Sequence, residues 1–198
     1  MASIRNALTY LGFEFTEYSN GIPDNPDDCI FVLPGVGSFS EASINIHRNG
    51  FLSLKDIKPK MIGICLGMQL LFDESEEGGL HHGLGLIPGQ VKAIRSVSSN
   101  EDLRVPHVGW ESQRIINPDA GICLGLSEKE DVYFVHSYCA IEVPNESLVS
   151  VVEYGDLEIT STVKSGSVIG FQFHPEKSGR DGLNILKETI LYLDCQNL

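Results

Sequence analysis

The sequence predicts an α/β domain in which a mixed β-sheet packs against helices. Helix-like and strand-like apolar patterns alternate over residues 1–72. From Gly83 onward, short strands separated by turns predominate, and apolar residues spaced between Leu183 and Leu193 predict a closing amphipathic helix. A chain of 198 residues without internal repeats or linker-like segments is expected to form one domain, residues 1–198.

The first half of the chain alternates between the two kinds of element. Residues 4–11 carry apolar side chains at helical spacing and are followed by Gly12, which predicts a helix and its end. The segments that follow are predicted as a strand over 13–18, a loop over 21–26, a strand covered on both faces over 29–33, a helix over 38–48 stopped by Asn49-Gly50, and a strand ending at Gly63.

The acidic residues 73–79 are expected to form a helix terminus and a solvated loop. In the second half, the short β-branched and aromatic segments predict strands, at 91–94, 105–110, 131–138, 149–153, 159–163 and 168–173. A lone histidine is more often structural than catalytic, and we expect this of His107.

Composition argues against several classes of function. The formal net charge is −13 at pH 7, and no Lys/Arg cluster is present, which disfavours a nucleic-acid partner because phosphate binding requires clustered cations. No apolar run approaches the length of a membrane span, and the first residues lack the layout of a signal peptide. We therefore expect a cytoplasmic protein with no membrane partner.

The cysteines and histidines do not form a metal-binding pattern. Five cysteines are an odd number, lie far apart and include no Cys-x-x-Cys pair, which disfavours a disulfide framework and a zinc site. The adjacent His81 and His82 have no third ligand at a suitable spacing. No metal and no cofactor are predicted.

The segment from Gly63 to Gly67 has the pattern of a nucleophile elbow with cysteine as its nucleophile. An apolar strand ends at Gly63, Cys65 lies between two glycines, and a helix-compatible pattern follows. Glycines permit a tight bend and close approach of a substrate. The positive end of the following helix is expected to lower the pKa of the Cys65 thiol. The pattern alone leaves open a buried structural cysteine.

Two further segments contribute candidate site residues. Residues 34–37, Pro-Gly-Val-Gly, follow a predicted parallel strand at its carboxyl end, where α/β sheets place ligand sites, although a plain strand-to-helix turn fits as well. His174 ends another strand, and Glu176 lies two residues beyond it, on the same side of an extended chain. Cys65, His174 and Glu176 thus form a candidate nucleophile, general base and orienting carboxylate.

These segments occur in the order in which they are found in the class I (triad) glutamine amidotransferases, and the chain resembles that family over nearly its whole length. The Pro-Gly-Val-Gly turn and the segment Pro106-His107-Val108-Gly109-Trp110 resemble in particular the glutaminase subunits of imidazole glycerol phosphate synthases. The resemblance implies a three-layer, flavodoxin-like fold with a mixed, mainly parallel sheet flanked by helices and an added antiparallel region.

The resemblance also implies roles for individual residues. Cys65, His174 and Glu176 would hydrolyse L-glutamine through a thioester. The backbone N–H groups of Leu66 and of Val36 and Gly37 would hold the oxyanion. The residues implied for binding glutamine are Gly35, Gln69, Ser137 and Tyr138.

The family further implies a partner. Ammonia would pass through an internal channel to a cyclase subunit, a (β/α)8 barrel, with which the chain forms a heterodimer in histidine biosynthesis. Lys177 resembles a position at the interface with that partner.

The chain differs from the family pattern in one respect, and several other functions are compatible with its sequence. Family members open with an apolar strand and a Gly-rich turn, whereas this chain opens at Met1-Ala2-Ser3, in the helix-like region, so the first family strand is expected to be absent. A paralogue that supplies ammonia to another synthetase, such as one modifying surface sugars, is an alternative. So are a non-catalytic partner-binding subunit and a cysteine peptidase or γ-glutamyl hydrolase.

Overall fold

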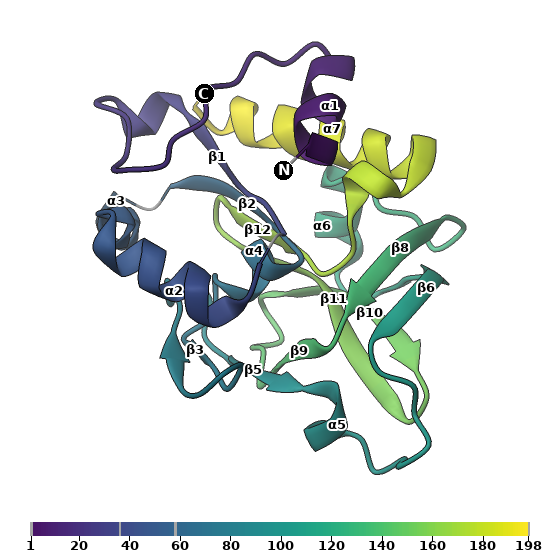
Figure 1. Ribbon diagram of the computed structural model, residues 1–198. Helices are drawn as coiled ribbons and strands as arrows, with labels where there is room; N and C mark the ends of the chain where they lie inside the picture. The colour runs from purple at the N-terminus through teal and green to yellow at the C-terminus, as the bar shows by residue number, and fades with distance from the viewer. Residues whose placement is uncertain (1, 36, 58, 198) are drawn as a thin grey trace.

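A computed structural model of the chain describes residues 2–35, 37–57 and 59–197 (Figure 1). In this part of the chain, the main sheet has the strand order β1-β2-β12-β11-β10-β7. Its strands are β1 Ile30–Leu33, β2 Lys60–Ile64, β12 Val168–Phe171, β11 Leu157–Ser165, β10 Leu148–Tyr154 and β7 Arg114–Ile115. β1, β2 and β12 run parallel, while β11, β10 and β7 add antiparallel pairs.

Two smaller sheets lie beside the antiparallel half. One has the order β4-β3-β5-β9, and the other is a two-stranded ribbon of β6 and β8. Their strands are β4 His81–His82, β3 Glu74–Ser75, β5 Gln90–Ala93, β9 Tyr138–Ile141, β6 His107–Ser112 and β8 Asp131–His136. Only Ser137 separates β8 from β9, so the chain passes from one small sheet to the other within a single residue.

Helices cover both faces of the parallel strands. On one face, α1 Ala2–Tyr10 and α7 Gly179–Asp194 bury apolar side chains against Ile62 and Ile64. On the other face, α2 Phe39–Arg48, α3 Leu54–Ile57 and α4 Leu66–Gln69 pack with Met61. Alternate β2 side chains thus enter different cores, which confirms the predicted fold class of a sheet between helical layers (Figure 1).

The remaining helices are short and lie in the connections. They are α5 Ile94–Val97, α6 Pro118–Cys123 and the 3₁₀ helices Pro26–Asp28, Phe51–Ser53, Pro175–Lys177 and Cys195–Asn197. Among the residues described, no helix has the length and apolar character needed to cross a bilayer.

The predicted helices over 4–11, 38–48 and 183–193 are confirmed, as are the strands of the second half. The strand predicted over 13–18 is wrong: the segment alternates in sequence but pairs with no strand in the described part of the chain, and Phe15 and Tyr18 are exposed. The cover predicted for both faces of 29–33 is confirmed, because Ile30 and Val32 pack against one core and Phe31 and Leu33 against the other. The residues of β1 are nevertheless only half-buried, and in the described part of the chain β1 pairs only with β2.

The prediction of a solvated acidic loop over 73–79 is also wrong in part. Glu74 and Ser75 form β3, and Ser75 is buried. The carboxylate of Glu77 accepts a hydrogen bond from the backbone N–H of Phe39 at 2.8 Å, and so binds the N-terminus of α2. Glu76 accepts one from the N–H of Ala93 at 2.9 Å. Glu77 thus joins the small sheet to α2, and Glu76 fastens the end of β5 within that sheet.

Gly67 provides a test of how closely α4 packs against β1. A Cβ atom on Gly67 would lie 2.0 Å from the carbonyl oxygen of Leu33, which is backbone and cannot rotate away. We predict that Gly67→Ala lowers the free energy of unfolding by about 3 kcal/mol, toward the upper end for overpacked sites. Urea denaturation measures this change.

The matched control for this test is Gly109→Ala. A Cβ atom on Gly109 would approach no atom closer than 3.4 Å, so this variant is expected to retain the stability of the parent chain. Equal stability of the two variants would contradict the close approach of α4 and β1.

Candidate active site

The parallel strands β1, β2 and β12 end at the same edge of the sheet. Leu33 pairs with Gly63, and Phe171 pairs with Ile64. The backbone N–H of Cys65 donates to the carbonyl of Phe171 at 2.6 Å. The Pro34-Gly35 turn, Cys65 and the segment leading to His174 therefore begin within one or two residues of this shared edge.

Cys65 occupies a strained backbone conformation. Its φ is 51° and its ψ is −106°, and among the described residues only Glu142 is another non-glycine with positive φ. Such conformations carry a free-energy cost and persist where the surroundings enforce them. The bend turns β2 directly into α4 and lies where the Gly-x-Cys-x-Gly pattern predicts an elbow.

The glycines around the elbow allow backbones to approach where side chains would collide. A Cβ atom on Gly63 would lie 2.5 Å from the carbonyl oxygen of Gly67. A Cβ atom on Gly35 would lie 2.7 Å from the Cβ of Cys65 and 3.2 Å from the Cε1 of His174. Gly35 therefore marks a point at which the cysteine and the histidine come together.

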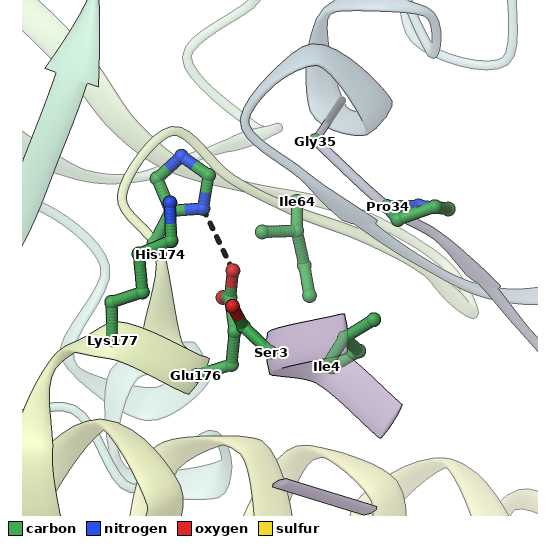
Figure 2. Close-up of a pocket in the computed structure, with 8 residues that line it drawn as sticks. All are labelled: Ser3, Ile4, Pro34, Gly35, Ile64, His174, Glu176 and Lys177. Carbon is green, nitrogen blue, oxygen red and sulfur yellow. Dashed lines mark hydrogen bonds and ion pairs between the residues drawn. The ribbon is translucent and has the colours of Figure 1, made fainter. Parts of the chain in front are cut away.

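His174 and Glu176 form a hydrogen-bonded pair with little exposure to solvent. The Nδ1 atom of His174 lies 2.8 Å from Oε1 of Glu176, a contact drawn in Figure 2. The backbone of His174 is held as well, because its N–H donates to the carbonyl of Tyr133 and its own carbonyl accepts from the Ser178 hydroxyl. The Glu176 carboxylate favours the tautomer with hydrogen on Nδ1, which leaves Nε2 able to accept a proton.

A small cavity opens beside this pair. Figure 2 shows the Glu176 carboxylate directed toward His174, with Ser3 and Ile4 of α1 on one side of the cavity and Ile64 and the Pro34-Gly35 turn on the other. Lys177 is exposed and lines the cavity with its neighbours. The cavity therefore lies between the first helix and the carboxyl ends of the parallel strands.

The Cys65 thiol makes hydrogen bonds to Val135 and Gln172. Its sulfur donates to the carbonyl of Val135 at 3.9 Å and accepts from the side-chain amide of Gln172 at 3.7 Å. Burial raises the pKa of the thiol to about 11, and the hydrogen bond from the N–H of Leu66 offsets this only in part. The expected lowering of the pKa is wrong, because desolvation outweighs the dipole of a helix only four residues long.

Two of the residues expected to bind substrate, Gln69 and Tyr138, are linked by a hydrogen bond. The buried Gln69 donates from Nε2 to the carbonyl of Tyr138 and to Oε1 of Gln172, at 3.1 Å in each case. The carbonyl of Ser137 accepts from the N–H of Ile94. Gln69, Gln172 and Cys65 thus form one connected polar cluster.

The expected oxyanion donors belong to two segments, the start of α4 and the loop that follows β1. Leu66 directly follows the bend, and its N–H interacts with the Cys65 sulfur. Gly37 has a φ of +95°, a conformation that glycine adopts readily. Val36 lies outside the described residues.

Sequence reasoning missed two polar residues of the site, Gln172 and His136. Gln172 precedes His174 by two positions in an extended segment, so its side chain points to the same side, and this spacing could have identified it. His136 donates a hydrogen bond from Nδ1 to the backbone carbonyl of Tyr138. The contact forms across a bend in the chain, and the sequence pattern does not reveal this bend.

The raised pKa of Cys65 predicts slow alkylation. At pH 8 the thiol is almost fully protonated, so iodoacetamide should modify Cys65 about tenfold more slowly than an ordinary free thiol, after allowance for the greater nucleophilicity of a more basic thiolate. The rate should rise with pH up to about 10 without a plateau, as measured by peptide mass spectrometry. Exposed Cys123 is the internal control, and a plateau for Cys65 below pH 8 would contradict the assignment.

Comparisons with known proteins identify the family of the chain. Residues 2–192 match the family model for glutamine amidotransferase class-I. The chain is 39% identical over 203 residues to imidazole glycerol phosphate synthase subunit HisH 2 of Vibrio vulnificus, covering 99% of this chain and 91% of that protein. It is 41% identical over 196 residues to imidazole glycerol phosphate synthase hisHF of Arabidopsis thaliana, covering 95% of this chain and 32% of that protein.

Solved structures show the same fold. A crystal structure of a glutamine amidotransferase superposes with a TM-score of 0.69 at 16% identity and covers 97% of this chain and 93% of its own. Together with the family match, these likenesses show that the chain belongs to the class-I glutamine amidotransferases and, within them, to the HisH subunits of imidazole glycerol phosphate synthase.

Proposed function

We propose that this chain is the glutaminase subunit of an imidazole glycerol phosphate synthase and supplies ammonia to a cyclase subunit in histidine biosynthesis. The observation that carries the proposal is Cys65 on its strained bend, next to the hydrogen-bonded pair of His174 and Glu176. The names of the relatives support the choice of synthase.

The first half of the reaction forms a thioester. His174 accepts the Cys65 thiol proton at Nε2, and the sulfur attacks the side-chain carboxamide carbon of glutamine. The imidazolium then donates its proton to the departing amine, which leaves as ammonia. Glu176 orients the ring and stabilises its positive charge through the 2.8 Å contact.

The second half releases glutamate. His174 takes a proton from water, the resulting hydroxide attacks the thioester carbon, and the Cys65 sulfur departs and recovers its proton. In both halves the developing oxyanion is held by the N–H of Leu66 and by donors of the loop containing Val36 and Gly37. Each such donor typically contributes about 100- to 1,000-fold to the rate.

Glutamine is bound by the polar cluster next to the thiol. Gly35 lies directly against Cys65 with no side chain between them, and Gln69 with the backbone of Ser137 and Tyr138 holds the amino-acid end of the substrate. Because burial keeps the thiol protonated at rest, we expect little hydrolysis until the site is rearranged by its partner. This coupling would limit the wasteful release of ammonia.

The surface adjoining the site has the character of a docking face for the (β/α)8 barrel of the cyclase. Val108 and Trp110 are large apolar residues on β6, and more than half of each is exposed. The Trp110 ring lies 5.7 Å from that of Tyr133, whose carbonyl holds the backbone of His174. Exposed Lys177 extends this docking face beside the cavity. A barrel seated there would receive ammonia close to where it forms.

Replacement of the nucleophile tests the hydrolytic reaction. We predict that Cys65→Ala lowers partner-stimulated release of glutamate from glutamine by at least about 1,000-fold, because no thioester can form. A coupled glutamate dehydrogenase assay measures the rate. Cys123→Ala, which changes an exposed cysteine on α6, should retain the rate of the parent chain, and comparable activity in both variants would contradict the assignment.

Charge reversal tests the docking face. We predict that Lys177→Glu weakens binding of the purified cyclase subunit about tenfold, through the loss of a favourable charge contact and the gain of an unfavourable one. Isothermal titration calorimetry measures the dissociation constant. Lys129→Glu makes the same charge change at another exposed lysine and should bind like the parent chain. Equal weakening in both variants would contradict the role of Lys177 in the docking face, because it would reflect only the change in net charge.

A further inference from the structure

Two buried histidines lie side by side next to residues 137–138, which are proposed to bind glutamine. His107 on β6 and His136 on β8 are paired in register, and their relative exposures are 0% and 6%. Nδ1 of His107 lies 3.1 Å from Nε2 of His136, and Nδ1 of His136 lies 2.8 Å from the carbonyl oxygen of Tyr138. The reaction steps described above use neither ring.

The positions of the hydrogens in this pair follow from the carbonyl at its end. A carbonyl oxygen can only accept, so Nδ1 of His136 carries hydrogen. Burial lowers the pKa of His136 to about 3 and that of His107 to about 4, so both rings are neutral in the physiological range. Nε2 of His136 then has a free lone pair and accepts from Nδ1–H of His107. Both rings therefore adopt the Nδ1–H tautomer.

The opposite arrangement fits less well. It would let Nε2–H of His107 face the Glu111 carboxylate, but that distance is 3.8 Å, too long for a hydrogen bond. It would also place an unprotonated Nδ1 of His136 2.8 Å from the Tyr138 carbonyl, with acceptor against acceptor. Nε2 of His107 accordingly has no hydrogen-bond partner in the described residues.

Packing fixes the His107 ring. It stacks on Phe134 with centroids 5.0 Å apart and on Tyr154 with centroids 3.9 Å apart. Stacking fixes the plane of the ring, and a half-turn within that plane would put a carbon in the place of Nδ1 and lose the 3.1 Å contact with His136. The stack thereby keeps Nδ1–H of His107 next to Nε2 of His136 and reinforces the tautomer that the Tyr138 carbonyl selects.

The Tyr138 carbonyl connects this pair to the nucleophile. The same oxygen accepts from Nε2 of Gln69 at 3.1 Å, and Gln69 also donates to Gln172, which donates to the Cys65 sulfur. Hydrogen bonds therefore link His107 through His136 and Tyr138 to the polar cluster of the candidate site.

We propose that His136, whose tautomer is selected by the Tyr138 carbonyl and reinforced by His107, is a positioning residue for the binding of glutamine. By holding the Tyr138 carbonyl, it aligns the backbone at residues 137–138 and the amide of Gln69, the groups that receive the amino-acid end of the substrate. This inference rests on the proposed glutaminase function and adds to it residues that never touch the reacting atoms.

Matched substitutions test the role of His136. His136→Leu removes the donor, whereas His136→Asn retains an N–H near the position of Nδ1. In the complex with the cyclase subunit, we expect His136→Leu to raise the KM for glutamine about three- to tenfold, the range for one lost hydrogen bond, with little change in kcat. His136→Asn should recover most of the affinity.

A second pair of variants tests His107. His107→Phe keeps the stacked ring and removes its donor, and should raise KM in the same direction. Tyr154→Phe keeps the same stack and loses only the hydrogen bond of its hydroxyl to the carbonyl of Arg104, so its kinetics should match the parent chain. If His136→Leu fails to fold, His107→Phe decides the kinetic outcome.

Nitrogen-15 NMR of the imidazole rings gives a readout independent of catalysis. The parent chain has six histidines, and spectra of the variants identify the two signals. Both rings are expected as Nδ1–H tautomers, and His107→Phe should shift His136 toward a mixture. An Nε2–H tautomer on His136, or unchanged KM in both His136→Leu and His107→Phe, overturns the inference. Absence of any glutaminase activity in the parent complex instead overturns the proposed function itself.

Discussion

The parallel pairing of β1, β2 and β12 is the constraint on which the site depends. It places three strand ends at one edge, and the 2.6 Å hydrogen bond from Cys65 to the carbonyl of Phe171 fastens the elbow to the strand that leads to His174. Residues more than a hundred positions apart in sequence thereby meet around Gly35. Neither the bend at Cys65 nor the pair of His174 and Glu176 would constitute a site without this register.

Burial then sets the chemical state of the groups brought together. The same packing that holds His174 against Glu176 withdraws the Cys65 sulfur from water and raises its pKa to about 11. A thiol of this kind is stable at rest and becomes nucleophilic when a base and oxyanion donors act on it together. The site therefore combines the proposed catalytic residues with a thiol of low reactivity at rest.

Much of the fold follows from local sequence patterns. The Gly-x-Cys-x-Gly segment specifies a bend from only five residues, since two glycines are needed where backbones approach within contact distance. His174 and Glu176 could be paired because residues two apart in an extended chain share a side. The helices α1, α2 and α7 were predictable from spacing and from the residues that end them.

What the sequence did not reveal depends on partners distant in the chain. The alternation over 13–18 is typical of a strand, yet strand formation requires a neighbour with which to pair. The acidic segment received its role from α2 and β5, and the pKa of Cys65 depends on burial that no local pattern records. Gln172 and His136 act through contacts with backbone and side chains that the fold alone brings near.

Direct detection of the thioester would test the central claim that Cys65 is the nucleophile. The complex with the cyclase subunit would be mixed with glutamine, quenched in acid during turnover and digested for mass spectrometry. We predict one γ-glutamyl group on the peptide containing Cys65, removable by hydroxylamine. Release of glutamate with the γ-glutamyl group on another residue of the parent chain would contradict the account. So would continued release of glutamate by the Cys65→Ala variant, which can form no such adduct at residue 65.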